Sequence, residues 1–165
     1  MKARLIIVCG LPGSGKTTVA QALEHDFGAV RLSPDDWMDA LSIDLYDEES
    51  RQRIEALQWT LAQRVLAVGM VVIIEWGTWA RAERDALRLR ARELGAAVEL
   101  RYVSAAPDTL FQRIRNRDRE NPPITQEDVA KWFAILQRPT TEEMALFDPP
   151  LEADSPKRRA ESQQQ

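Results

Sequence analysis

The sequence predicts an α/β protein in which a parallel sheet lies between two layers of helices, a three-layer α/β/α arrangement. Two observations favour this class. Short apolar runs, typical of strands buried on both faces, alternate along the chain with longer segments of helical periodicity. The first apolar run also leads through a glycine-rich loop into a helix. Strands that alternate with helices in this way imply right-handed crossovers between parallel strands.

Four apolar runs are expected to be the strands of this sheet. The first reads LIIVC and is followed by a glycine, and its apolar side chains on both faces favour the central place. The other runs end in a proline-containing, an acidic or a polar segment. The expected strands cover residues 5–9, 29–32, 70–74 and 98–103.

Helices are expected between these strands and after the last one. Glycines at 28, 69 and 95 supply stop signals, and Thr78 and Thr125 are expected to cap the helices that follow them. In the third helix, Ile54, Leu57, Leu61, Val65 and Val68 are expected to face the core, and in the fourth, Leu87, Ala91 and Leu94. The expected helices cover residues 17–27, 33–41, 50–68, 78–94, 107–117 and a last segment from 125 to the stop at Pro139.

Length and composition predict one domain and limit the classes of partner. A chain of 165 residues has room for one complete core, expected over residues 1–150, with 151–165 as a disordered polar tail. The net charge of −4 and the pI of about 5.2 predict no general attraction to nucleic acid. Cys9 is the only cysteine, which fits a reducing cytoplasm, and residues 68–74 are too short an apolar run to span a membrane. The oligomeric state is not predicted.

Residues 10–17 read GLPGSGKT and match the phosphate-loop pattern G-x-x-x-x-G-K-[ST] at every fixed position. Glycines allow successive backbone N–H groups to turn toward one phosphate, and the following helix adds its positive end. Lys16 is expected to reach the β- and γ-phosphates of ATP, and the Thr17 hydroxyl to bind Mg²⁺. The expected nucleotide-binding residues are Gly10, Pro12, Gly13, Ser14, Gly15, Lys16, Thr17 and Thr18.

Carboxylates follow two of the expected strands, at the edge of a parallel sheet where ligands bind. Glu75 is expected to hold Mg²⁺ or to contact the substrate, and an incidental acid at a strand end is the alternative. Asp35 is the candidate general base, placed to take a proton from an incoming hydroxyl. The alternative is that Asp35 and Asp36 only begin a helix, with Ser33 or Asp35 as its cap.

Arginines are dense in the expected helix that begins at Pro107. Arg113 and Arg117 share a helix face because they are four residues apart. Phosphoryl transfer spreads negative charge over the transferred group, so arginines on a lid over ATP would stabilise it. Residues 107–124 are therefore the expected lid, and a solvated helix whose arginines pair with Asp118 and Glu120 is the alternative.

Three of the five tryptophans, Trp37, Trp76 and Trp79, lie beside the proposed cleft residues. Aromatic side chains around an acceptor pocket can stack on a ring or exclude water. Together with Asp35, these three residues are the expected substrate pocket. Packing between the helices of the cleft is an equally good explanation of the tryptophans.

Four segments, GLPGSGKTT, LSPDDWM, IIEWGTWARAER and TTEEMALFD, together resemble the AAA_33 or zeta-toxin-like group of small P-loop kinases. This group is similar to polynucleotide 5′-hydroxyl kinase and chloramphenicol phosphotransferase. The resemblance implies a P-loop NTPase fold like that of nucleoside-monophosphate kinases. It also implies phosphate and Mg²⁺ ligation by Lys16 and Thr17, a base at Asp35, and lid arginines at Arg113 and Arg117. Glu75 departs from the aspartate that is commoner in such sites.

The sequence thus favours an ATP-dependent kinase that phosphorylates a hydroxyl group of a small molecule. A nucleic-acid 5′-hydroxyl kinase is the second hypothesis, supported by the resemblance and opposed by the net acidity. The third is an ATP-binding switch or ATPase without a phosphate acceptor. The family's acceptors are diverse, so the resemblance does not identify a substrate.

Overall fold

The computed structural model describes residues 2–120 and 122–152. Its centre is a parallel sheet of β1 (Arg4–Cys9), β2 (Val30–Leu32), β3 (Val71–Gly77) and β4 (Ala97–Tyr102), in the order β2-β3-β1-β4. The strand β1 pairs with β3 on one side and with β4 on the other, which confirms the predicted central position. The predicted parallel α/β fold is therefore confirmed.

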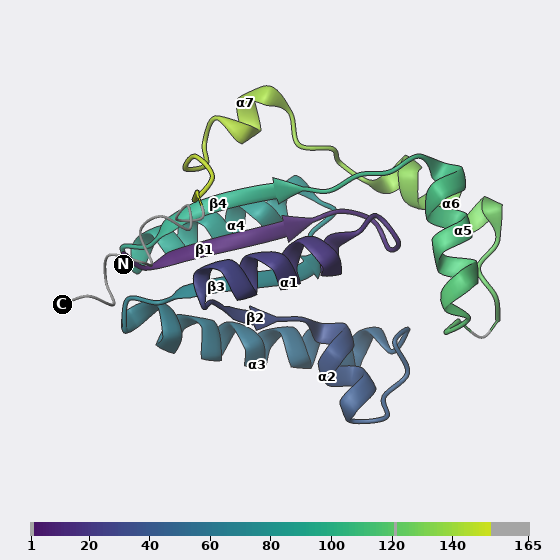
Figure 1. The fold of residues 1–165 in the computed structure, drawn as a ribbon, viewed down its shortest axis with the longest axis horizontal. Coiled ribbons are helices and arrows are strands. Elements are labelled where there is room, and N and C mark those ends of the chain that lie inside the picture. The colour runs from purple at the N-terminus through teal and green to yellow at the C-terminus, as the bar shows by residue number, and fades with distance from the viewer. Residues whose placement is uncertain (1, 121, 153–165) are drawn as a thin grey trace, which may run out of the picture.

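Helices cover both faces of the sheet and extend beyond its carboxyl end (Figure 1). They are α1 (Lys16–Phe27), α2 (Pro34–Ala40), α3 (Glu48–Ala67), α4 (Arg81–Glu93), α5 (Pro107–Arg117), α6 (Gln126–Ile135) and α7 (Thr141–Met144). On one face, Leu5, Ile7 and Cys9 pack with residues of α3 and α4. On the other face, Ile6 and Val8 pack with α1. The alternation of buried side chains along β1 thus produces the three layers.

The helices α5 and α6 form a separate unit at the carboxyl end of the strands (Figure 1). Their side chains and Leu136, the C-cap of α6, build a third apolar cluster, which also contains Leu110, Ile114 and Val129. Leu11 of the glycine-rich loop belongs to the same cluster. This unit packs directly on the loop and contains most of the segment 107–124, whose function as a lid stays a prediction; the unit is called the lid below.

The buried face of α3 differs from the predicted one. Ile54 is buried as expected, but Leu57, Leu61 and Val68 are 62%, 37% and 73% exposed. The buried stripe is instead Ile54, Gln58, Ala62 and Leu66. Within the described residues, the buried Gln58 is bonded through one end of its amide: its Oε1 accepts a hydrogen bond from Trp76 Nε1 at 2.8 Å, and its Nε2 has no partner. The buried face of α3 therefore includes a polar residue with a tertiary partner.

Two expected features near helix ends are also wrong. Thr78 does not cap α4, which begins at Arg81 after Ala80, and the Glu83 carboxylate accepts a hydrogen bond from the Ala80 N–H. Leu94 follows this helix and is 40% exposed. The short helix α7 was not predicted. Its N-cap is Thr140, whose hydroxyl accepts from the Glu143 N–H.

The chain after α7 returns along the edge strand β4. The Asp148 N–H donates to Val98 O at 2.7 Å, and the Val98 N–H donates to the Asp148 carboxylate. The Leu151 N–H donates to Glu99 Oε2 at 2.8 Å, so the first residue of the expected tail is bound to the sheet. Residues 153–165 of that tail lie outside the described residues. No helix within 2–120 and 122–152 has the length and apolar character of a membrane span.

The shifted face of α3 predicts unequal costs for two leucine truncations on one helix. Leu66→Ala should lower the free energy of unfolding by about 2–5 kcal/mol, because Leu66 is 1% exposed and its removal leaves a cavity. Leu57→Ala should change it by less than about 1 kcal/mol, because Leu57 is mostly in solvent. Urea unfolding of both variants measures this, and equal losses would contradict the assigned face.

Candidate active site

The glycine-rich loop connects β1 to α1. At two of its glycines, neighbouring atoms leave no room for a side chain. A Cβ on Gly10 would lie 2.3 Å from Val103 O, the carbonyl that follows β4. Gly13 has a φ of +77°, and its Cβ would lie 3.0 Å from Ile114 of α5. The loop is therefore held between the sheet and the lid, in a conformation that requires glycine at both positions.

Lys16 begins α1 and is half-buried at the carboxyl end of β1. Among the described residues, its Nζ donates one hydrogen bond, to Leu11 O at 2.9 Å across the loop. Burial lowers the pKa of Lys16 to about 8, although the nearby charges of Glu75 and Asp35 raise it. A partly buried ammonium with few hydrogen-bond partners is stabilised strongly when an anion binds beside it.

Thr17 and Glu75 lie together beside Lys16. The Thr17 hydroxyl donates a hydrogen bond to Glu75 Oε1, which connects the first turn of α1 to β3. Glu75 Oε2 accepts from Arg31 Nη1 at 2.8 Å, and the Glu75 side chain is 5% exposed. Both oxygens of the buried Glu75 carboxylate thus accept hydrogen bonds. One of the two donors is Thr17, the expected Mg²⁺ ligand of the loop.

Arg31 is a functional-site residue that the sequence analysis did not identify. It projects from β2 and also pairs with Asp36 and, through Nε at 3.1 Å, with Glu24. Burial tends to lower its pKa, but the hydrogen bonds to Asp36 and Glu75 raise the pKa above its ordinary value. The available signal was an arginine inside a short strand just before the acidic pair 35–36.

Asp35 lies in the first turn of α2, and its side chain is exposed. Ser33 is the N-cap of this helix, which resolves the choice between Ser33 and Asp35. Asp35 Oδ1 accepts from Arg51 Nη2 of α3 at 2.6 Å. Glu55, one turn after Arg51, is half-buried, and burial raises its pKa to about 7. The groups around Asp35 therefore include an arginine and a carboxyl whose charge changes near neutral pH.

The lid contributes arginines that contact the phosphate loop and α2. Arg113 Nη1 donates to Gly13 O at 3.1 Å and to Ser14 O at 3.3 Å. Arg117 pairs with Glu120, as the alternative interpretation expected, yet its charge still acts to lower the pKa of Lys16. Arg119 follows α5, and its Nη2 lies 3.9 Å from Asp39 Oδ2 of α2. The lid thus extends from the phosphate loop across to the helix that carries Asp35.

The three tryptophans of the expected pocket do not share one location. Trp37 and Trp76 pack against the main core, and Trp76 is fixed by its bond to Gln58. Trp79 packs on the lid cluster, with its ring centroid 6.3 Å from that of Trp132. Packing thus accounts for much of their burial, and their predicted contact with an acceptor stays a prediction.

The structure brings together most of the predicted site residues. Lys16, Thr17 and Glu75 form one group, Arg113 contacts the loop, and Asp35 lies near enough to influence the pKa of Lys16. Pro12 lies within the loop, and Thr18 is exposed on the first turn of α1. Within the described residues, no cluster of three or more His, Cys, Asp or Glu side chains forms a metal site.

Comparison with known proteins identifies the fold and its relatives. A family model described as an AAA domain, AAA_33, matches residues 5–139. The chain is 26% identical over 147 residues to "Probable gluconokinase" from Schizosaccharomyces pombe, a match that covers 84% of this chain and 75% of that protein. The chain is thus similar in sequence to a protein whose name describes a kinase.

Solved structures with the same fold include a gluconokinase from Sinorhizobium meliloti, at a TM-score of 0.59 and 22% identity over 85% of this chain and 78% of that one. Kti12 from Chaetomium thermophilum, solved with ADP-AlF₃, gives a TM-score of 0.66 at 21% identity, with coverage of 88% and 86%.

A chain of the Pnkp1/Rnl/Hen1 RNA repair complex gives a TM-score of 0.68 at 20% identity. The match covers 89% of this chain but only 47% of that one, so this protein spans about half of its length. These likenesses show a P-loop NTPase fold of the kinase-like type. Because the AAA_33 model matches most of the sequence, the chain belongs to the AAA_33 family of AAA domains.

Proposed function

We propose that this protein is an ATP-dependent kinase that transfers the γ-phosphate of ATP-Mg²⁺ to a hydroxyl group of a small molecule. The observation that carries the proposal is the position of Lys16. Its half-buried ammonium lies between the phosphate loop and two carboxylates, Glu75 and Asp35, which have separate places and separate partners. One carboxylate is buried against the loop, and the other is exposed across the cleft.

Two glycines and one buried hydroxyl of the loop support the binding of a nucleoside triphosphate. Gly10 and Gly13 have positive φ angles and no room for a Cβ, and the Ser14 hydroxyl is buried without a partner in the described part of the chain. Successive N–H groups in such a loop form a concave site for phosphate oxygens. Lys16 would exchange its bond to Leu11 O for the β- and γ-phosphates.

Thr17 and Glu75 are the residues that would hold Mg²⁺. The two side chains already contact each other, so an ion beside the Thr17 hydroxyl would be within reach of Glu75, directly or through water. Mg²⁺ held by these residues would neutralise negative charge on the phosphates. Arg31 holds Glu75 from its other oxygen and so fixes the direction of the free lone pairs.

Asp35 is the proposed general base. Its side chain is 58% exposed, which leaves it open to an acceptor that enters from solvent. Arg51 fixes one carboxylate oxygen, and the other oxygen would accept the proton of the attacking hydroxyl. The gluconokinase relatives support a small hydroxylated acceptor of this kind.

Arg113 is proposed to stabilise the transferred phosphoryl group from the lid. It now donates to two loop carbonyls, so only a rearrangement of its side chain is required to reach a phosphate on the loop. Arg117 is proposed for the same role, after release from Glu120. Both would act as the lid excludes water from the site.

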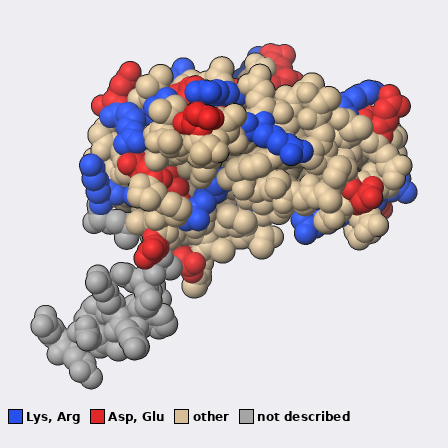
Figure 2. All heavy atoms as spheres, turned by 90° about the horizontal axis from the view of Figure 1, so that it is seen from above, with Lys and Arg blue, Asp and Glu red and all other residues tan. Residues whose placement is uncertain are grey.

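Phosphorylation of nucleic-acid 5′-hydroxyl ends is the second candidate. The fold shared with the RNA repair complex favours it. The net charge of −4 opposes it, and on the face shown in Figure 2 basic and acidic side chains are intermixed. A switch or ATPase without an acceptor is the third candidate, which the exposed Asp35 opposite Lys16 disfavours.

The kinase proposal predicts a selective loss of turnover in Asp35→Asn. We expect kcat for a small-molecule acceptor to fall about 10²- to 10⁴-fold, because the base is lost, while MgATP binding is retained. Phosphorylated product is measured across panels of polyols, sugar acids and hydroxylated antibiotics, with 5′-hydroxyl oligonucleotides as a separate arm. Asp26→Asn, an exposed carboxylate in the last turn of α1, is the control and should keep full activity.

An unchanged rate in Asp35→Asn would remove Asp35 as the base. Product on oligonucleotides alone would replace the small-molecule proposal with the nucleic-acid one. ATP hydrolysis that no acceptor accelerates would favour the ATPase.

The lowered pKa of Lys16 predicts that ATP binding takes up a proton at alkaline pH. With a pKa of about 8, the Lys16 amine of the nucleotide-free protein is mostly neutral at pH 9. A bound phosphate raises the pKa of Lys16, so the amine takes up a proton when ATP binds. Uptake at pH 9 should approach about 0.9 proton and vanish near pH 6.5. Calorimetry in two buffers of different ionisation enthalpy measures it. Lys16→Arg, which does not titrate, should show no uptake, and equal uptake in this variant would contradict the assignment.

A further inference from the structure

The turn that ends β3 contains a strained residue next to the phosphate loop. Thr78 has a φ of +49°, directly after Gly77 at +86°. A positive φ is common for glycine but a genuine outlier for a β-branched residue. The Thr78 hydroxyl is also buried and has no hydrogen-bond partner within the described residues. The surrounding structure must therefore hold this conformation in place.

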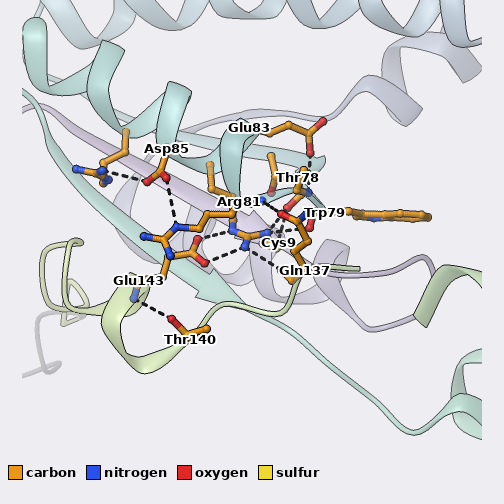
Figure 3. A network of polar contacts seen from close by, with 12 residues as sticks. Cys9, Thr78, Trp79, Arg81, Glu83, Asp85, Gln137, Thr140 and Glu143 are labelled. Carbon is orange, nitrogen blue, oxygen red and sulfur yellow. Dashed lines mark hydrogen bonds and ion pairs between the residues drawn. The ribbon is translucent and has the colours of Figure 1, made fainter. Parts of the chain in front are cut away.

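Arg84 of α4 provides that restraint. The side chain is fully buried, and within the described residues its guanidinium donates six hydrogen bonds, one of them a long bond from Nη1 to Cys9 Sγ at 3.9 Å. Nη1 donates to Thr78 O at 2.9 Å and to Trp79 O at 3.0 Å. Nε and Nη2 donate to the two carboxylate oxygens of Glu143, at 2.6 and 2.9 Å. Figure 3 shows Cys9, Thr78, Trp79, Gln137 and Glu143 gathered in this network.

The other side of the same turn is bonded to the start of the phosphate loop. Gly77 O accepts from the Gly10 N–H at 3.2 Å, and Thr78 O accepts from the Cys9 thiol at 3.2 Å. The register of β1 and β3 also slips by one residue at this place, where Cys9 pairs with Gly77. The turn 77–79 thus lies between Arg84 and the residue where the loop begins.

The exit of the lid is tied to the same guanidinium. Arg84 Nη2 donates to Gln137 O at 2.8 Å, two residues after α6 ends. The Gln137 N–H donates to Trp79 O, and its side-chain oxygen accepts from the Arg81 N–H. One buried side chain therefore connects the phosphate loop, through the turn, with the point where the lid returns to the core.

We infer that Arg84, fixed by Glu143, is a positioning residue for nucleotide binding: it holds Thr78 in its strained conformation and thereby places Gly10 and the phosphate loop. This inference rests on the proposed function only as far as nucleotide binding. Arg84 bonds to the turn, to Gln137 and to Glu143, so its effect on the phosphate loop is transmitted through the turn. A guanidinium suits this task because its planar fork meets one carboxylate and several carbonyls at fixed angles.

The test measures MgATP affinity by calorimetry at a temperature where circular dichroism shows every variant folded. Glu143→Gln should weaken MgATP binding about tenfold, since the turn loses its restraint. Thr140→Ala, which only removes the N-cap of α7 and loosens Glu143, is the milder variant, with an expected loss of about threefold. The matched control is Glu99→Gln, another buried carboxylate that binds two arginines, Arg4 and Arg101, and it should change affinity less than about twofold.

A rescue experiment separates positioning from simple stabilisation. Thr78→Gly removes the strain, so the turn should keep its shape without the restraint. In the Glu143→Gln background it should return MgATP affinity to within about threefold of Thr78→Gly alone, while the lowered melting temperature persists. Equal affinities in Glu143→Gln and Glu99→Gln, or no rescue by Thr78→Gly, would overturn the inference. A protein that binds MgATP but phosphorylates no acceptor overturns only the kinase proposal.

Discussion

The site depends on the close approach of two backbones at Gly10. The carbonyl that follows β4 lies where any side chain at this position would begin, so β1 can turn into the loop here only because Gly10 has no Cβ. Gly10 is also bonded to the turn after β3. Gly10 thus contacts the ends of β3 and β4 at the point where β1 leads into the loop. These contacts position the loop and the start of α1.

Of the three charged groups beside the loop, Lys16 has the fewest hydrogen-bond partners among the described residues. Glu75 is held by Thr17 and Arg31, and Asp35 is held by Arg51, whereas the Lys16 ammonium donates to one carbonyl of its own loop among the described residues. Burial makes that state costly, and the lowered pKa of Lys16 expresses the cost. A bound polyanion would offset this cost of burying the Lys16 ammonium. The nearby carboxylates of Glu75 and Asp35 repel further negative groups. The electrostatics therefore favour a phosphate chain in one fixed place.

The sequence predicted the elements that local patterns determine. Apolar runs and glycine stops located all four strands and six of the helices, and the loop pattern located Lys16 and Thr17. It failed where a distant partner decides the outcome. Gln58 lies on the buried face of α3, where Trp76 bonds to it, and Leu57 lies on the exposed face. Thr78 is not a cap because its turn is held by Arg84, whose counter-ion Glu143 is 59 residues away. Such pairs leave no periodic signal in a single sequence.

Calorimetric titration with MgATP tests the central claim most directly when wild type is compared with Gly10→Ala. The account predicts single-site saturable binding to the wild type and no detectable binding to Gly10→Ala that circular dichroism shows to be folded, because an added methyl group displaces the loop from Val103 O. Equal affinity in the two proteins, or no association with the wild type, would contradict it.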